Sequence, residues 1–220
     1  MIEGLYIGGI VPLLPEGQST GIFKRPVAGP LRLTWEGFVG DAQADRRVHG
    51  GPEKAVHHYA AENFARLAAA FPALAAQLLP GSIGENLSTH GWSEESVCIG
   101  DIFRLGTARV QVSQPRSPCW KIDHKFATEG MARFIAEQGI AGWYYRVLEE
   151  GEAAVGDAFE LLERPAPRAT LARLWRAGLA HRPDAAELAE LATAPGLAEG
   201  WVRKLGERAD WLRKHGGGTQ

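Results

Sequence analysis

The stretch Asp101-Ile102-Phe103-Arg104-Leu105-Gly106-Thr107-Ala108-Arg109-Val110-Gln111-Val112-Ser113 largely alternates apolar and polar side chains on both sides of a Gly-Thr pair. A period of two residues is typical of a β-strand that buries one face. Two such segments joined by a two-residue loop that contains glycine form a hairpin signal. The stretch therefore predicts two antiparallel neighbours of a β-sheet.

Similar short apolar segments, bounded by glycine or other turn residues, lie on both sides of this hairpin. The first predicted strand of the hairpin extends back to Val97, and the other predicted strands are Leu5–Ile10, Leu31–Thr34, Ala55–Tyr59, Gly142–Leu148 and Ala158–Leu162. Many short strands separated by turns favour a barrel or a sandwich over a doubly wound parallel sheet. We therefore expect a mainly β protein with helices, of the α+β class.

Two helices interrupt this β region, and three more follow it. Ala60–Phe71 ends at a proline, and Gly130–Gln138 ends at a glycine, both ordinary stop signals. Arg164–Pro167 contains two prolines, which make a stiff linker. The helices expected after it are Leu171–Gly178 with Thr170 as its cap, a second from the cap Asp184 to about Thr193, and Leu197–His215. The sequence thus predicts a β domain over residues 1–164 and a three-helix domain over residues 165–220.

The composition limits the class of protein. The chain has 220 residues, 45% of them apolar and 23% charged, with a formal net charge of −2, which is typical of a globular protein and argues against a general nucleic-acid binder. No apolar run approaches the roughly 20 residues of a membrane span, and Met1–Leu5 shows no secretory signal. We expect a cytoplasmic protein without membrane contact.

A glycine-rich basic segment is the first candidate site. Arg46, Arg47, His49 and Lys54 surround the sequence Gly50–Pro52. A Gly-Gly pair lets backbone N–H groups approach a ligand closely, and with neighbouring cations they make an anion site. The alternative is an ordinary turn whose basic side chains face water. The spacing does not match the phosphate loop of nucleotide-binding proteins.

Two adjacent histidines follow, His57 and His58, in a segment that reads as a strand. Because side chains alternate along a strand, their rings are expected on opposite faces. One ring can then line an interior site while the other packs elsewhere, although a structural histidine is an equally good interpretation of either.

The two cysteines are too few for a disulfide framework or a four-cysteine zinc site, and their surroundings differ. Cys98 lies in an apolar run, which is typical of a buried and inert thiol. Cys119 instead follows Gln114–Pro118, a segment made rigid by two prolines, with Arg116 before it and Lys121 after it. Nearby cations favour the thiolate, which is the form that attacks electrophiles and binds metals.

Several motifs in this order resemble those of MOSC-domain proteins, most closely the YiiM-like subgroup. They are Val48–Pro52 with Lys54 and His58, Ile83–Ser88, Gly100–Arg104 and Val112–Cys119. The resemblance spans about Gly4 to Leu162, and the helices from Thr170 are similar to the 3-alpha domain of that subgroup.

This resemblance implies a MOSC-type β-barrel that binds the molybdenum cofactor, a pyranopterin whose dithiolene holds the metal. It implies reduction of N-hydroxylated compounds, such as hydroxylaminopurines, to amines by oxygen-atom transfer. Electrons are expected from a separate flavin-containing reductase, since the chain shows no flavin or iron–sulfur motif. The role of protein ligand to the metal falls on Cys119, and a soft thiolate suits such a centre.

The other site residues are assigned on chemistry within that resemblance. The cofactor-binding set expected is His49, Gly50, Gly51 and Lys54 for the phosphate, Gly84, Glu85 and Asn86 for the pterin edge, and Arg116 with the adjoining Ser117 for pterin or phosphate oxygens. His58 is our own hypothesis for a proton donor near the metal, because N–OH reduction consumes protons.

Two other functions fit parts of the pattern. A non-catalytic module that carries the cofactor or its sulfur would need the same pocket. A zinc hydrolase that uses His57, His58 and Cys119 is less favoured, because adjacent histidines on a strand diverge.

Overall fold

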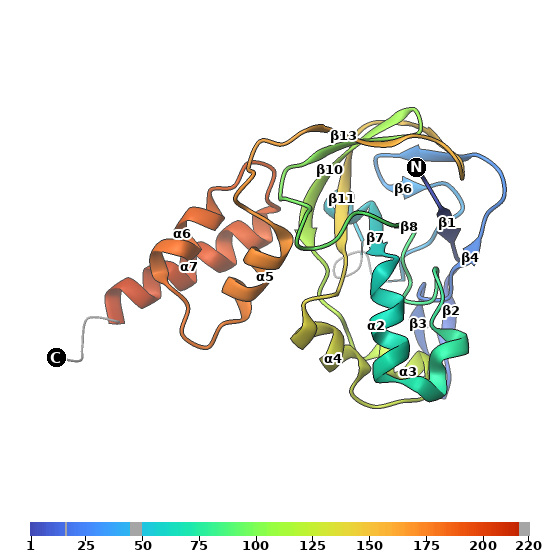
Figure 1. The fold of residues 1–220 in the computed structure, drawn as a ribbon, viewed down its shortest axis with the longest axis horizontal. Coiled ribbons are helices and arrows are strands. Elements are labelled where there is room, and N and C mark those ends of the chain that lie inside the picture. The colour runs from blue at the N-terminus through green and yellow to red at the C-terminus, as the bar shows by residue number, and fades with distance from the viewer. Residues whose placement is uncertain (16, 45–49, 216–220) are drawn as a thin grey trace.

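A computed structural model describes residues 1–15, 17–44 and 50–215 of the chain. The protein consists of a curled β-sheet with helices along one end, and of three further helices that pack beside the sheet (Figure 1). This mixed α+β architecture, with a half-barrel of strands, confirms the predicted fold class.

Eight strands form the main sheet, in the order β13-β9-β10-β11-β7-β8-β1-β4. Neighbouring strands run antiparallel except β7 and β8, which are parallel. Their bounds are β1 Gly4–Ile7, β4 Arg25–Pro26, β7 Val56–Ala60, β8 Leu87–Thr89, β9 Ile102–Leu105, β10 Ala108–Pro115, β11 Trp143–Glu149 and β13 Phe159–Glu163. A second, three-stranded sheet has the order β12-β5-β6, with bounds Gly151–Ala153, Leu31–Thr34 and Gly37–Phe38. A third sheet consists of β2 Val11–Leu13 and β3 Gln18–Thr20.

The predicted hairpin is confirmed, but its first strand is shorter than expected. Strands β9 and β10 pair antiparallel across the Gly106 turn, where φ is +62°. The prediction that the strand begins at Val97 is wrong. The Asp101 carboxylate accepts a hydrogen bond from the Cys98 amide (2.9 Å), which turns the chain before β9. Cys98 forms only an isolated bridge, with Thr170.

A β-bulge shapes the end of β10. The pairing with β11 shifts between Val112 and Gln114, so that Ser113 has no partner in the ladder. Its Oγ lies 2.6 Å from the Glu53 carbonyl oxygen, and its own carbonyl accepts from the Ala198 amide (2.9 Å). A bulge bends its strand and re-aims the side chains that follow, here those of Gln114 to Arg116.

Three helices and one 3-10 segment, η2, lie along one end of the sheet (Figure 1), and a second 3-10 segment, η1, lies against β10 and β11. They are α2 Glu62–Ala70, α3 Lys121–Lys125 and α4 Met131–Gln138, with η1 Pro52–Lys54 and η2 Pro72–Gln77. Side chains from β7 and these helices form their own apolar cluster, which includes Tyr59, Leu67, Ile122 and Ile135. Helix α3 was not predicted, since five residues are too few to show a helical period.

The three C-terminal helices are α5 Leu171–Leu179, α6 Ala185–Ala192 and α7 Glu199–His215. Both predicted caps form: Thr170 Oγ1 accepts from the Arg173 amide (3.1 Å), and Asp184 Oδ1 from the Ala186 amide (2.8 Å). Leu174 and Leu205 belong to the same apolar cluster as the sheet. The sheet and the helices therefore share one core, and the division at residue 164 stays a prediction.

Candidate active-site cleft

A cleft of about 610 Å³, its open mouth included, lies beside β7 and the bulged end of β10. Five of its lining residues were predicted from the sequence: Lys54, Gly84, Asn86, Arg116 and Cys119. The cleft thus brings together residues from three of the four motifs that carry the family resemblance.

Arg116 and Cys119 stand on the segment that leaves β10. The backbone of Arg116 is fixed by a hydrogen bond from its amide to the Gly142 carbonyl (3.0 Å). Its side chain is buried, with the residue 7% exposed; Nη2 donates to the Ile83 carbonyl (3.2 Å), and Nη1 makes no hydrogen bond with any described residue. A buried donor without a partner is costly, so Nη1 is a strong candidate for contact with a ligand. Cys119 is a half-buried free thiol in the same wall.

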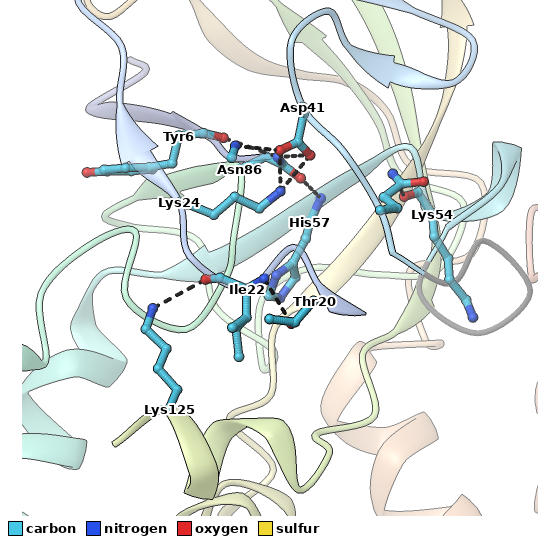
Figure 2. Close-up of polar contacts among 11 residues, drawn as sticks. Tyr6, Thr20, Ile22, Lys24, Asp41, Lys54, His57, Asn86 and Lys125 are labelled. Atoms are coloured by element: carbon cyan, nitrogen blue, oxygen red, sulfur yellow. Dashed lines mark hydrogen bonds and ion pairs between the residues drawn. The ribbon is translucent and has the colours of Figure 1, made fainter. Parts of the chain in front are cut away.

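A buried ion pair that the sequence did not reveal also lines the cleft (Figure 2). Lys24 Nζ donates to both carboxylate oxygens of Asp41, and each side chain is only 5% exposed. Asp41 also accepts from the Gly8 amide (2.8 Å) and from Asn86 Nδ2 (2.9 Å). The carboxylate is therefore held from three directions.

The cleft carries more positive than negative charge. Besides Lys24 and Arg116, it is lined by Lys54 and Lys121, with Asp41 as a neutralising partner of one of them. Burial lowers the pKa of Lys54, and its Nζ lies 6.0 Å from the centre of the Tyr144 ring. Several cations around one cavity favour an anionic ligand such as a phosphate.

The two histidines of β7 face opposite sides of the strand, as predicted. His57 lines the cleft. Burial, assisted by the nearby charge of Arg116, lowers the pKa of His57 well below its ordinary value, so its imidazole is neutral at pH 7. Its Nε2 is buried and makes no hydrogen bond with the described residues.

His58 points into the core and is not brought to the cleft. Its ring nitrogens lie 3.0 Å from Tyr145 Oη and 3.0 Å from Thr89 Oγ1, and its ring centre is 4.3 Å from that of Trp143. Burial lowers its pKa to about 3. Both ring nitrogens are engaged by hydroxyl groups in the core, so the one N–H of the neutral imidazole is not directed at the cleft, and the proton-donor hypothesis for His58 does not fit this structure.

Glu85 and Asn86 use their side chains for hydrogen bonds within the protein. Glu85 is fully buried and outside the cleft lining; its carboxylate accepts from the amides of Gly81 and Ile83, and burial raises its pKa. It therefore shapes the loop that carries Gly84 and does not reach a ligand. Asn86 lines the cleft, but its amide group is engaged with Asp41, the Tyr6 carbonyl (3.1 Å) and the His57 amide (3.1 Å).

The remaining predicted residues lie outside the lining. Gly50 and Gly51 precede η1 but do not border the cleft, and Ser117 is exposed beyond it. His49, like Arg46 and Arg47, lies outside the described residues. The phosphate assignment for these positions stays a prediction.

Sequence reasoning missed Lys24, Asp41 and Tyr144 as site residues. Tyr144 carried a usable signal, because in the predicted strand it alternates with Trp143 and Tyr145 and so faces the other side. Lys24 and Asp41 lie 17 residues apart, without a local pattern that joins them. The described residues contain no group of three His, Cys, Asp or Glu side chains placed to hold a metal. His57 borders the cleft with Cys119 while the His58 ring lies in the core, so the three residues of the zinc-hydrolase alternative are not brought together. None of the described helices has the length and apolarity to cross a bilayer.

The sequence matches the family described as the MOSC domain over residues 45–160, and the YiiM-like 3-alpha helix domain over residues 170–209. It is 38% identical over 204 residues to protein YiiM of Escherichia coli, covering 91% of this chain and 89% of that protein. It is 39% identical over 194 residues to the uncharacterized protein YflK of Bacillus subtilis, covering 88% and 86%. A protein of Gibberella moniliformis named "Reductase" is 36% identical over 178 residues, which are 80% of this chain and 32% of that protein.

Solved structures show the same relationship. The crystal structure of YiiM from Escherichia coli superposes with a TM-score of 0.80 at 31% identity, over 96% of this chain and 92% of that one. YiiM from Geobacillus stearothermophilus gives a TM-score of 0.80 at 30% identity, over 95% and 98%. With both domain matches in order, and relatives that align along nearly the whole chain, this protein belongs to the MOSC-domain family, in its YiiM-like group with a C-terminal 3-alpha domain.

Proposed function

We propose that this protein binds the molybdenum cofactor in the cleft and reduces N-hydroxylated compounds to amines. Membership of the MOSC family, together with a relative named a reductase, suggests an enzyme of the oxidoreductase type. The observation that carries the proposal is the placement of the Cys119 thiol in one cleft with Arg116, Lys24, Lys54 and Lys121.

The residues of the cleft fit such a cofactor. A thiolate is a soft ligand, suited to a metal that is also bound by dithiolene sulfur. The buried Nη1 of Arg116 has no hydrogen-bond partner among the described residues, and it would be satisfied by an anionic oxygen. The cofactor would thus be held by Cys119 at its metal and by Arg116 and Lys54 at its phosphate or pterin oxygens.

When bound, the cofactor supplies a centre that passes two electrons to the substrate. The chain's own residues keep the site in shape: Glu85 fixes the loop around Gly84, and Asn86 fixes Asp41. His57 stays neutral beside Arg116 and so adds no charge to an anion-binding wall. These groups define where a ligand lies before any chemistry occurs.

The electrons are proposed to come from a separate flavin-containing reductase. The fungal protein named "Reductase" matches this chain over only 32% of its length. That protein therefore has a large part without a counterpart here, which agrees with a reductase function that needs more than this chain.

The test is metal analysis and turnover of protein made in a host that synthesises the cofactor. We expect molybdenum and pterin in the wild-type protein, and reduction of a hydroxylaminopurine when a flavoprotein reductase or a reduced dye supplies electrons. Cys119→Ser should lose the metal-linked activity. Cys98→Ser is the matched control, since Cys98 is buried away from the cleft and contacts the Pro167 carbonyl (3.5 Å).

Two outcomes would contradict the proposal. Wild-type protein that holds molybdenum but reduces no hydroxylamine, and instead hands the cofactor to an apo-enzyme, would identify a carrier module. Retention of metal and activity in Cys119→Ser would remove the ligand role from that residue.

A further inference from the structure

Lys24 has a donor that its protein partners do not use. Among the residues that the structure describes, its two hydrogen bonds both go to the carboxylate of Asp41, whereas an ammonium group carries three N–H donors. The side chain is 5% exposed and lines the cleft that holds Cys119. At least one N–H of a buried cation is therefore left for whatever occupies the cleft.

The position of Lys24 is fixed by a chain of hydrogen bonds. Asp41 holds the ammonium, Asn86 Nδ2 holds Asp41 at 2.9 Å, and the His57 amide holds Asn86 Oδ1 at 3.1 Å (Figure 2). The pairing of β7 with β8 sets this arrangement, because His58 lies opposite Leu87 and so places His57 next to Asn86. The ammonium is thus anchored to the main sheet.

The charges that face Lys24 act in opposite directions on its proton. Burial lowers the pKa of Lys24, while Asp41, and more weakly Glu85, raise it. The positive charge of Lys24 in turn helps to keep the neighbouring His57 neutral. An ammonium whose pKa is lowered gives up a proton more readily than an exposed lysine does.

Asp41 also borders a second cavity, with Ile10, Glu36 and Phe38 among its other lining residues. The two cavities share residues 41–43. Asp41 therefore lies between the two cavities, while Lys24 lines the cleft.

We propose that Lys24 donates the proton that turns the departing hydroxyl group of the substrate into water, and that Asp41 is the positioning residue that holds Lys24 for this step. The inference rests on the proposed function. The overall reaction is R–NH–OH + 2 e⁻ + 2 H⁺ → R–NH₂ + H₂O. The N–O bond breaks, the oxygen takes one proton from Lys24 and leaves as water, and the nitrogen takes the second proton from solvent.

The electron pair comes from the partner reductase named above, and Lys24 regains its proton from solvent. General acids of this kind typically contribute about 10²–10⁴-fold to the rate. A purely structural lysine would instead affect folding and cofactor content, and not the pH dependence of turnover.

The experiment compares Lys24→Arg, Asp41→Asn and a control, Lys204→Arg, with the wild-type protein in a dye-coupled assay. Arginine keeps the positive charge but does not release its proton in this pH range. We expect Lys24→Arg to retain molybdenum, to change KM little and to lower kcat about 100-fold or more. Lys204 is exposed on α7, with its Nζ 4.6 Å from the centre of the Trp201 ring, and its variant should behave as the wild type.

Asp41→Asn adds a signature that a structural role would not produce. A proton donor must be protonated, so turnover falls as pH rises through the pKa of Lys24. Loss of the Asp41 charge lowers that pKa, and the alkaline limb of the kcat profile should move to lower pH. NMR titration of the lysine side chains in protein without cofactor, with Lys24→Arg for assignment, should show the same downward shift directly.

The outcomes separate this inference from the proposed function. If the wild-type protein reduces no N-hydroxylated compound, the proposed function fails. If the wild type is active while Lys24→Arg keeps its kcat, or if Asp41→Asn leaves both the titration and the alkaline limb unmoved, the inference is overturned.

Discussion

Asp101 and Asp41 are both buried aspartates paired with a cation, but the two cations differ in how many of their N–H donors remain available to a ligand. Asp101 accepts from Arg164 Nε (2.9 Å) and Nη2 (2.6 Å) and from the Cys98 amide (2.9 Å). Nη2 of Arg164 also donates to the Ser96 carbonyl (2.9 Å). This pair fastens the turn before β9 to the segment that leads to the C-terminal helices.

The Lys24–Asp41 pair has the same charges and a different use. A guanidinium binds a carboxylate through a fixed fork and keeps its proton, whereas an ammonium is a point charge with rotatable donors and a pKa that responds to burial. The arginine pair therefore suits a joint between two parts of the fold, and the lysine pair suits a cleft that receives a ligand. The four predictions below test this difference.

The largest effect on the free energy of unfolding is expected when each aspartate is replaced by alanine in a separate variant. Asp101→Ala leaves Arg164 and the Cys98 amide without their acceptor in a site where Asp101 is 0% exposed, and breaking a buried pair costs about 3–5 kcal/mol. Asp41→Ala should cost less, about 1–3 kcal/mol, because burial lowers the pKa of Lys24 and an ammonium that loses its partner can release its proton, whereas a guanidinium keeps it. Urea unfolding of both variants measures this, and equal losses would break the comparison.

A second substitution tests whether the sheet and the C-terminal helices share one continuous apolar core. Leu174 of α5 is fully buried in the apolar cluster that it shares with the sheet, so Leu174→Ala should lower the free energy of unfolding by about 3 kcal/mol. Leu179 in the same helix is 51% exposed, and Leu179→Ala serves as its control. Two unfolding transitions in place of one would show that the helices fold separately, against the single core described here.

The pH dependence of stability tests the core beneath the cleft. Because the pKa of His58 is lowered to about 3 in the folded protein, the unfolded chain binds a proton first as the pH falls below about 6.5. Stability from this group is present above pH 6.5 and is lost toward pH 3, with a slope of about 1.4 kcal/mol per pH unit. His58→Phe should flatten the slope by up to that amount.

The control for this measurement is a histidine with the opposite shift. A hydrogen bond from the His90 ring to the Glu3 carboxylate raises the pKa of the exposed His90, so His90→Asn should leave the slope just below pH 6.5 as it is in the wild type. A His58→Phe variant with an unchanged slope would show that His58 becomes charged without unfolding.

The smallest effect is expected at the contact between α4 and α5. Trp175 Nε1 donates to the Ala136 carbonyl (2.8 Å), which also accepts from the Gly139 amide (3.2 Å). Trp175→Phe removes one neutral hydrogen bond and should cost about 1 kcal/mol. Trp211 is 59% exposed on α7, so thermal unfolding of Trp211→Phe should match the wild type, and a loss as large as at Trp175 would contradict this account.

Local patterns predicted the parts of the fold that local chemistry decides. The alternation around Gly106 gave the β9–β10 hairpin, and Thr170 and Asp184 marked two helix starts, because strand faces and caps depend on nearby residues. The cleft is different, since its walls come from distant segments. The sequence pointed to Arg116 and Cys119 through their prolines and charges, but the contact of Lys24 with Asp41 exists only after the sheet has formed.

The same reason explains why the sequence led us to His58 and Glu85, which the fold does not bring to the cleft lining. His57 and His58 are equivalent in a sequence, and only the direction in which β7 faces distinguishes the one that borders the cleft. Glu85 was predicted to contact the ligand because a carboxylate suits the edge of a heterocycle. In the fold, nearby amides of Gly81 and Ile83 take up both of its oxygens.

The hydrogen bond from the Ala198 amide to the Ser113 carbonyl has a consequence for the order of events during protein synthesis. The bulge at Ser113 precedes Arg116 in the cleft wall, and the Ala198 amide that binds the Ser113 carbonyl is synthesised 85 residues later. Domains begin to fold from their N-terminal side while translation proceeds, yet this hydrogen bond can form only when residue 198 has emerged from the ribosome. We therefore expect the cleft wall to be complete only after the C-terminal helices have begun to form.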